Sequence, residues 1–341
     1  MQSDKLYPGV CDFHVHVGEK IGGYDLRDDF SALDRIAKKN GIAAIGAFVT
    51  EDESLPLSEK LRRMRRDAEE HFSGQVFWHL TPVKTTTEEL IPLLGPDCDL
   101  KLYTTYKDAG IHSSYEEIGR WMEELSGLKT RILVHCEDNA VIEKASAEHP
   151  FKTPFDHTLR RPELAEKIAV ERILDLAIKH GHPVHIVHVS TPGAALLIAQ
   201  AKADFPGITC ETAPHYLLYN EDKLKGKNPH RWLCTPPYRS ERSRGMLAEL
   251  LQDGVFDIIA SDHCAFTSED KDRFKDTPEK VPCGISGLDS LFASCYHGLV
   301  QQGTISLERL VGLSCFCPAE LMGMGAERKF TLERLLGKEE P

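Results

Sequence analysis

Short apolar, β-branched runs alternate along this chain with longer segments whose apolar residues recur every three or four positions. The short runs have the length and composition of buried strands, and the longer segments have the periodicity of amphipathic helices. The pattern predicts eight strands, at 10–16, 42–49, 76–83, 98–104, 130–136, 184–190, 208–214 and 258–263. It predicts helices between them, at 30–40, 57–71, 87–94, 115–126, 162–180, 192–204 and 239–252.

Repeated alternation of strand and helix predicts parallel strands that close into a (β/α)₈ barrel of the α/β class. A doubly wound open sheet is the alternative, but no glycine-rich phosphate loop follows any predicted strand. After the eighth strand, a polar loop at 267–280 leads into helices at 288–301, 306–313 and 318–322. We therefore assign residues 1–322 to one barrel domain with C-terminal helices, and residues 323–341 to a charged, partly disordered tail.

Composition narrows the range of partners and compartments. The formal net charge of −12 argues against a nucleic-acid or anionic-membrane surface. No apolar run is long enough to span a bilayer, and the first residues lack the profile of a signal peptide. The ten cysteines are scattered, with only Cys315 and Cys317 closely spaced, so we interpret them as reduced thiols. We expect a cytoplasmic protein without nucleic-acid or membrane partners.

Ionisable residues gather at the carboxyl ends of the predicted strands, where barrels of this type place their active sites. They are His14 and His16 on the first strand, Lys101 on the fourth, His135 on the fifth, His188 on the sixth and Asp262 on the eighth. Each residue alone has an ordinary structural explanation. Burying all of them in one mouth without partners is costly, however, and a metal centre would remove that cost.

This donor set favours two divalent ions. One ion would be held by His14, His16 and Asp262, and the other by His135 and His188. A lysine among cations loses its proton more easily, and its neutral amine can add CO₂, so carboxylated Lys101 would bridge the ions. A hydroxide between the ions is the expected nucleophile, because metal binding lowers the pKa of water from about 15.7 to about 7.

Short motifs in a fixed order over nearly the whole chain resemble the cyclic amidohydrolases, the group of dihydropyrimidinase, hydantoinase, dihydroorotase and allantoinase. The motifs are DFHVH at 12–16, KLYTTYKD at 101–108, VHCEDN at 134–139, RPE at 161–163, VHVS at 187–190, CETAPHYL at 210–217, PPYR at 236–239 and SDHCAF at 261–266. The resemblance implies a TIM-type metallo-dependent hydrolase barrel with two Zn²⁺ ions on the six residues above. It also implies a homo-oligomer, a dimer or tetramer. Relatives usually have an additional small β-sandwich built from segments before and after the barrel. Because those segments are short here, we expect the β-sandwich to be absent.

Three positions favour one branch of that group. Tyr106, followed by Lys107-Asp108, is similar to hydantoinase and dihydropyrimidinase, in which this tyrosine hydrogen-bonds the ring carbonyl. Gly18 and Phe266 stand where dihydroorotases place an arginine and a histidine for the substrate carboxylate. Dihydropyrimidinase or hydantoinase chemistry is therefore the main prediction. Dihydroorotase of pyrimidine biosynthesis stays open, because Cys210-Glu211 resembles that enzyme.

The expected reaction is hydrolysis of a dihydropyrimidine, a hydantoin or a related ring, with Asp262 and Tyr106 as catalytic residues. Asp262 would take the proton of the hydroxide and deliver it to the leaving ring nitrogen, while Tyr106 polarises the carbonyl. We also expect substrate contacts from Thr235, Cys283 and His215; the first two stand where hydantoinases have serine and asparagine. Two alternatives remain: a non-catalytic scaffold, and a one-metal deaminase in which Lys101 has no role.

Overall fold

The computed structural model describes residues 5–52, 54–325 and 329–338, and its centre is a sheet of eight parallel strands. Each strand pairs with the next one along the chain, in the order β2-β5-β6-β7-β8-β9-β10-β11. The strands are β2 (Val10–Val15), β5 (Ile42–Thr50), β6 (Gln75–Thr81), β7 (Cys98–Tyr103), β8 (Ile132–His135), β9 (Val184–Ile186), β10 (Ile208–Thr212) and β11 (Ile258–Ile259). Every one overlaps a predicted run, which confirms the predicted barrel.

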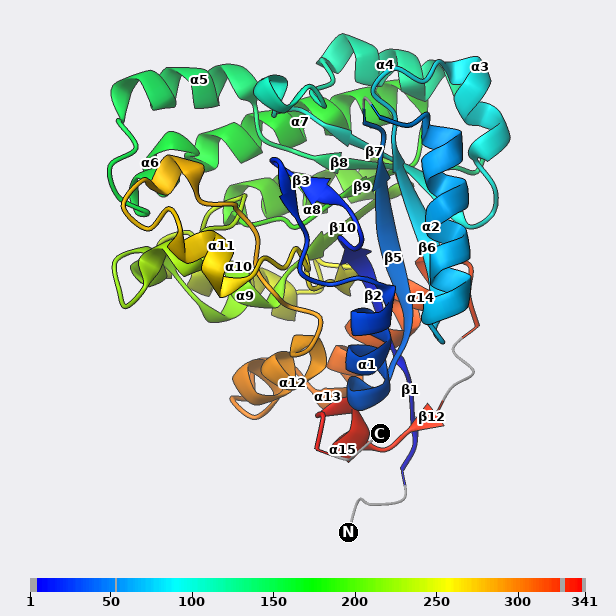
Figure 1. Ribbon diagram of the computed structural model, residues 1–341, viewed down its shortest axis with the longest axis vertical. Coiled ribbons are helices and arrows are strands. Elements are labelled where there is room, and N and C mark those ends of the chain that lie inside the picture. Colours follow the sequence, from blue (N-terminus) through cyan, green and yellow to red (C-terminus); the bar gives the residue numbers. More distant parts are fainter. Residues whose placement is uncertain (1–4, 53, 326–328, 339–341) are drawn as a thin grey trace.

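The first and last strands meet through a few hydrogen bonds rather than a long ladder. The backbone N–H of His16 donates to the carbonyl of His263 at 2.8 Å, and the N–H of His263 donates to the carbonyl of His14 at 3.2 Å. The Asp12 carboxylate accepts from the backbone N–H of Ser261 at 2.9 Å. These contacts join β2 to the segment after β11, so that the sheet is nearly closed (Figure 1).

Helices cover the outer face of the barrel (Figure 1). The longer ones are α1 (Phe30–Asn40), α2 (Leu57–His71), α4 (Tyr115–Glu124), α7 (Glu163–His180), α8 (Pro192–Asp204) and α10 (Glu241–Gln252), with the short α3 (Thr87–Leu90) after β6. Side chains of Asp29, Ser114 and Thr191 accept backbone N–H groups at the starts of α1, α4 and α8. These caps satisfy otherwise unpaired donors, which is why the helices begin at the predicted places.

Several elements differ from the prediction because they lie in the loops. Helices α5 (Asn139–Glu148) and α6 (Asp156–Arg160) stand between β8 and α7; in α5 only Ala145 is buried, so no apolar stripe marks that helix in the sequence. The other loop elements are α9 (Pro214–Leu218), α11 (Ser268–Asp272) and the hairpin of β3 (Lys20–Ile21) and β4 (Tyr24–Asp25). The predicted C-terminal helices appear as α12 (Leu291–Cys295), α13 (Leu307–Val311) and α14 (Cys317–Leu321).

The two ends of the described chain lie side by side (Figure 1). Strand β1 (Tyr7–Pro8) pairs antiparallel with β12 (Lys329–Phe330), and α15 (Leu332–Leu335) follows, with Leu335 buried. Residues 329–338 of the predicted tail therefore contain a strand and a short helix that fold onto the barrel; the partly disordered tail as a whole stays a prediction. The charge of the segment hid its few apolar positions. Residues 326–328 and 339–341 of the predicted tail lie outside the described residues.

An apolar cluster fills the barrel below the mouth. It contains residues of β2, β5, β6, β8 and β11, with Val187 after β9, Ala319 of α14 and Met322 directly after α14. Only the inner face of a barrel is shared by all of these elements. Phe13 belongs to this cluster, yet its neighbour His14 also points inward. A register shift between β2 and β5 over Asp12–Val15 breaks the strict alternation and makes this possible.

Candidate metal centre and active site

Four imidazole rings form a row across the mouth of the barrel. The ring centroids of His16 and His14 are 5.5 Å apart, those of His14 and His188 are 5.4 Å apart, and those of His188 and His135 are 4.5 Å apart. His14 lies in β2 and His16 directly follows it, while His135 ends β8 and His188 lies two residues after β9. The structure thus brings all four predicted histidine ligands into contact.

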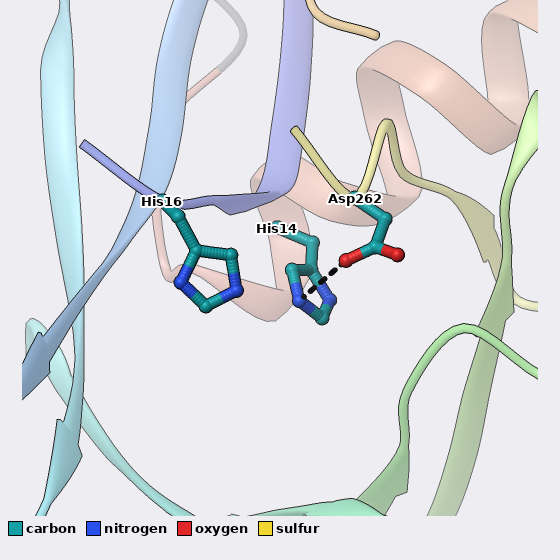
Figure 2. A group of neighbouring side chains, drawn as sticks. All are labelled: His14, His16 and Asp262. Atoms are coloured by element: carbon teal, nitrogen blue, oxygen red, sulfur yellow. Dashed lines mark ion pairs between the residues drawn. The ribbon is translucent and has the colours of Figure 1, made fainter. Parts of the chain in front are cut away.

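The first part of the row is completed by a carboxylate. The Nε2 atom of His14 lies 3.1 Å from the Oδ1 atom of Asp262, and one ligand atom from each of His14, His16 and Asp262 lies within 4.8 Å of the others (Figure 2). Two imidazole nitrogens and one carboxylate oxygen at such spacing can hold a divalent ion.

Glu211 fixes the orientation of His14, and the ligand prediction had not included it. Its Oε1 atom lies 2.5 Å from Nδ1 of His14, and its Oε2 atom lies 3.2 Å from Nε2 of His185. Burial raises the pKa of this carboxyl group, but the two histidines outweigh burial and hold the pKa below its usual range. An ionised Glu211 keeps the proton of His14 on Nδ1 and leaves Nε2 free to act as a ligand.

Lys101 lies in β7 and is 1% exposed. Its Nζ atom is 5.0 Å from the ring centroid of Phe48, and that ring in turn contacts the rings of His14 and His16. Among the described residues no carboxylate lies within ion-pair distance of this ammonium group. Burial lowers the pKa of Lys101 to about 8, against the attraction of Glu211 and Asp262. A small fraction of the amine, about a tenth, is therefore neutral at pH 7.

Three predicted site residues have a strained backbone. Four described non-glycine residues have positive φ, and three of them are Tyr106 at +70°, His188 at +37° and Asp262 at +53°. His188 and Asp262 consequently follow β9 and β11 in sharp turns instead of ending the strands. Such conformations cost about 1–3 kcal/mol each and cluster at functional sites. There they direct a side chain toward the site in a way that a regular strand could not.

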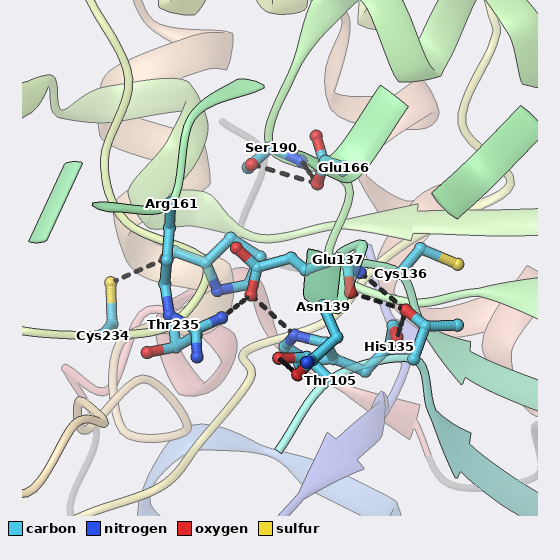
Figure 3. Close-up of polar contacts among 12 residues, drawn as sticks. Thr105, His135, Cys136, Glu137, Asn139, Arg161, Glu166, Ser190, Cys234 and Thr235 are labelled. Atoms are coloured by element: carbon cyan, nitrogen blue, oxygen red, sulfur yellow. Dashed lines mark hydrogen bonds and ion pairs between the residues drawn. The ribbon is translucent and has the colours of Figure 1, made fainter. Parts of the chain in front are cut away.

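A second ion pair lies beside His135. The Oε2 atom of Glu137 is 2.9 Å from Nε2 of His135, and Nη1 of Arg161 donates to the same oxygen (Figure 3). The guanidinium carbon of Arg161 lies 5.2 Å from the ring centroid of Tyr106, whose ring centroid is 5.0 Å from that of His135. Sequence reasoning had singled out the motifs containing Glu137 and Arg161 but had assigned neither residue a role.

The predicted substrate residues lie on separate loops around this mouth. The Oγ1 atom of Thr235 lies within hydrogen-bond distance of Nε2 of His157, at 3.0 Å, and the side chain of Thr235 also contacts the thiol of Cys283. His215 is the second residue of α9 and is buried, with its Nε2 atom unpartnered among the described residues. Whether these side chains touch a substrate stays a prediction.

The chemistry of the donor set tests whether the site suits a metal. Burial lowers the pKa values of His14 and His135 to about 4, which keeps these imidazoles neutral. Neutral imidazoles, a carboxylate and an amine able to form a carbamate match the preferences of zinc.

A large cavity elsewhere on this face does not contain the predicted chemistry. Its volume is about 820 Å³, and it is lined by residues from 220–232 and 266–286, including Lys223, Trp232 and Phe266. None of the six predicted ligands lines it. We therefore place the reaction at the row of histidines.

His157 supplies a test of the loop that carries Thr235. Its Nε2 atom contacts the Cys234 carbonyl at 3.1 Å, and burial together with Arg161 lowers its pKa to about 3. Between pH 6.5 and pH 3 the imidazole of His157 binds a proton in the unfolded chain but not in the folded chain. The free energy of unfolding therefore falls as the pH falls. The free energy of unfolding of the unsubstituted protein, relative to that of His157→Gln, should therefore drop by about 2 kcal/mol between pH 7 and pH 5. Urea unfolding at both pH values measures this, and a constant difference would contradict it.

Comparison with known proteins places this geometry in a family. The model of the amidohydrolase family matches residues 6–327. Dihydroorotases of Brevibacillus brevis and Bacillus cereus are 28% and 29% identical to the chain; the matches cover 92% and 95% of it, and 72% and 74% of those proteins. Dihydropyrimidinase from Brevibacillus agri has a TM-score of 0.87 at 25% identity, over 94% of this chain and 71% of that one. A D-hydantoinase has a TM-score of 0.85 at 25% identity, over 93% and 71%. Among the described residues, no helix is long and apolar enough to cross a membrane.

Proposed function

The chain belongs to the amidohydrolase family, and on that premise we propose that it hydrolyses a neutral cyclic amide of the dihydropyrimidine or hydantoin type. The relatives and the structural neighbours named above are cyclic amidohydrolases, and this chain is an enzyme of that kind. The observation that supports the site most directly is the row of four imidazoles completed by Asp262 and Lys101 at the carboxyl ends of the strands.

We further propose two zinc ions on these residues. His14, His16 and Asp262 would hold one, His135 and His188 the other, and N6-carboxylated Lys101 would bridge them. Zinc bound there would supply Lewis acidity toward the ring carbonyl and would lower the pKa of water. The buried, partly neutral amine of Lys101 supports the carbamate, because only the uncharged amine can add CO₂.

Asp262 transfers the proton, and Tyr106 polarises the substrate carbonyl. Asp262 accepts a proton from the attacking water as its oxygen bonds to the carbonyl carbon, and it gives that proton to the ring nitrogen as the C–N bond breaks. The side chain of Asp262 is 12% exposed, so it is accessible from the mouth. The hydroxyl of Tyr106 makes no hydrogen bond among the described residues and is free to donate one to the carbonyl oxygen.

The charges around the mouth favour a neutral ring. Gly18 has no side chain to offer a substrate, and Phe266 is a buried apolar residue. Arg161 is close to Tyr106, but Glu137 neutralises it. A substrate carboxylate would therefore find no unpaired cation at any of these three positions.

Dihydroorotate is the second candidate substrate. It is favoured by the names of the curated relatives, which are dihydroorotases at 28–29% identity over more than nine-tenths of this chain. Its ring carries a carboxylate that the neutral rings lack. Comparing the two classes of substrate therefore decides between the candidates.

The test is ring opening by protein produced with zinc and bicarbonate. The substrates are dihydrouracil, hydantoin, dihydroorotate and allantoin, and the control is the same protein stripped of metal with a chelator. We expect turnover of a neutral ring that is lost on stripping and restored by zinc. Turnover of dihydroorotate alone would overturn the proposed substrate class. Failure on all four rings by a protein that binds no zinc would favour the scaffold alternative. A cytoplasmic homo-oligomer stays a prediction.

A further inference from the structure

A buried ion pair connects the two catalytic parts of the mouth. Glu137 is 0% exposed, and the side chain of Arg161 is 13% exposed. Arg161 contacts Glu137 on one side and the ring of Tyr106 on the other, while Glu137 contacts His135. The chain of contacts therefore runs from a predicted metal ligand to the predicted carbonyl-polarising tyrosine without a gap.

Several further contacts hold this pair rigidly. The Oγ1 atom of Thr104 accepts from the backbone N–H of Glu137 at 2.9 Å, and its hydroxyl is 3.0 Å from the carbonyl of His135. On the other side, Nη1 of Arg239 donates to the backbone carbonyl of Arg161 at 2.6 Å, and Nε of Arg239 donates to Ser190 at 3.0 Å. Both partners are thus fixed through their backbones as well as their side chains.

The contacts define what each partner does. A carboxylate can only accept a hydrogen bond, so Glu137 requires the proton of His135 to sit on Nε2 and leaves the lone pair of Nδ1 for a metal. A guanidinium is planar and lies well over an aromatic ring, whereas an ammonium group has no such plane. Arg161 therefore sets the position of the Tyr106 ring, whose backbone is already held at an unusual φ of +70°.

We propose that Glu137 and Arg161 are positioning residues with separate roles. Glu137 selects the tautomer with which His135 binds the second metal, and Arg161 places Tyr106 against the substrate carbonyl. The inference about Arg161 rests on the proposed function, whereas the inference about Glu137 concerns metal binding and can be tested without any substrate.

Two conservative variants separate the two roles. Glu137→Gln should lower the affinity for the second zinc ion about 10- to 100-fold, because the amide can present either an acceptor or a donor to His135. Arg161→Lys keeps the charge beside Glu137 and should keep both zinc ions. It should lower kcat about tenfold or more while KM changes less than about threefold, since the planar contact with Tyr106 is lost.

Zinc affinity is measured by dialysing each protein against buffers of graded free zinc and determining bound zinc per chain. The matched control for Glu137→Gln is Glu51→Gln, which alters a buried glutamate that accepts from the backbone N–H groups of Val83, Lys84 and Thr85 instead of contacting a histidine ring. The matched control for Arg161→Lys is Arg160→Lys, whose guanidinium binds the carbonyls of Ser146 and His149 away from the mouth. Thermal unfolding of all four variants reports on folding.

The outcomes distinguish the inference from the proposed function. If Glu137→Gln binds both zinc ions as tightly as the unsubstituted protein, the tautomer role is wrong, whatever the substrate. If Arg161→Lys keeps kcat on a ring that the unsubstituted protein opens, the positioning of Tyr106 is wrong while the proposed function stands. Should no ring be opened, the proposed function fails and the role of Arg161 fails with it, but the zinc measurement still decides on Glu137.

Discussion

An Asp262→Asn variant should lose kcat by about 10³-fold or more while binding substrate nearly as well as the unsubstituted protein. Positioned acid–base groups contribute about 10²- to 10⁴-fold to catalysis, and an amide can neither accept nor return the proton. Asparagine keeps a ligand oxygen and tolerates the φ of +53° at this position, so the change isolates proton transfer better than alanine does. Steady-state kinetics and bound zinc per chain measure the outcome.

The control for Asp262→Asn lies at the other end of the same strand. Asp257 precedes β11, where its carboxylate accepts from Lys202 at 2.6 Å and from the backbone N–H of Cys210 at 2.7 Å. Since the active site of a barrel lies at the carboxyl ends of its strands, Asp257→Asn should lower stability and leave kcat unchanged. Unchanged turnover in Asp262→Asn would show that another group moves the proton.

The second large effect concerns Lys101. A Lys101→Ala variant should bind less zinc and lose nearly all turnover, because the chain then lacks the bridging carboxylate that we propose. The substitution also leaves a space in a buried position, and acetate or propionate can enter it and supply the missing carboxylate. We therefore expect these acids to restore turnover about tenfold or more above the unrescued level.

Lys101→Met is the matched variant for this rescue. Methionine fills the space with a side chain of similar length, so short acids should restore nothing. Rescue of both variants, or of neither, would argue against a bridging carbamate. A ¹³C NMR spectrum of the unsubstituted protein prepared in labelled bicarbonate supplies a readout independent of activity. A carbamate carbon signal that disappears in Lys101→Met is the expected result.

The elements that the sequence predicted well are those governed by local pattern. Buried parallel strands need continuous apolar runs, and covering helices need an apolar stripe, so the alternation along the chain was sufficient to predict the barrel. The bounds of α1, α2 and α8 agree with the prediction. The six predicted ligands could be named for a related reason. Each stands at or near the end of a strand, and parallel strands in a barrel bring those ends to one mouth.

What the sequence alone could not decide depends on contacts between distant residues. Glu211 lies 197 positions from His14, and no local pattern connects them, although their contact determines which nitrogen of His14 can bind a metal. Arg161 and Tyr106 meet only because the loops after β7 and β8 converge above the barrel. The pairing of β1 with β12 likewise needs both ends of the barrel to be in place. Residue types and strand ends thus predicted the six candidate metal donors. Closure of the barrel decided their tautomers, the strained backbone at His188 and Asp262, and the ion pair that connects His135 to Tyr106.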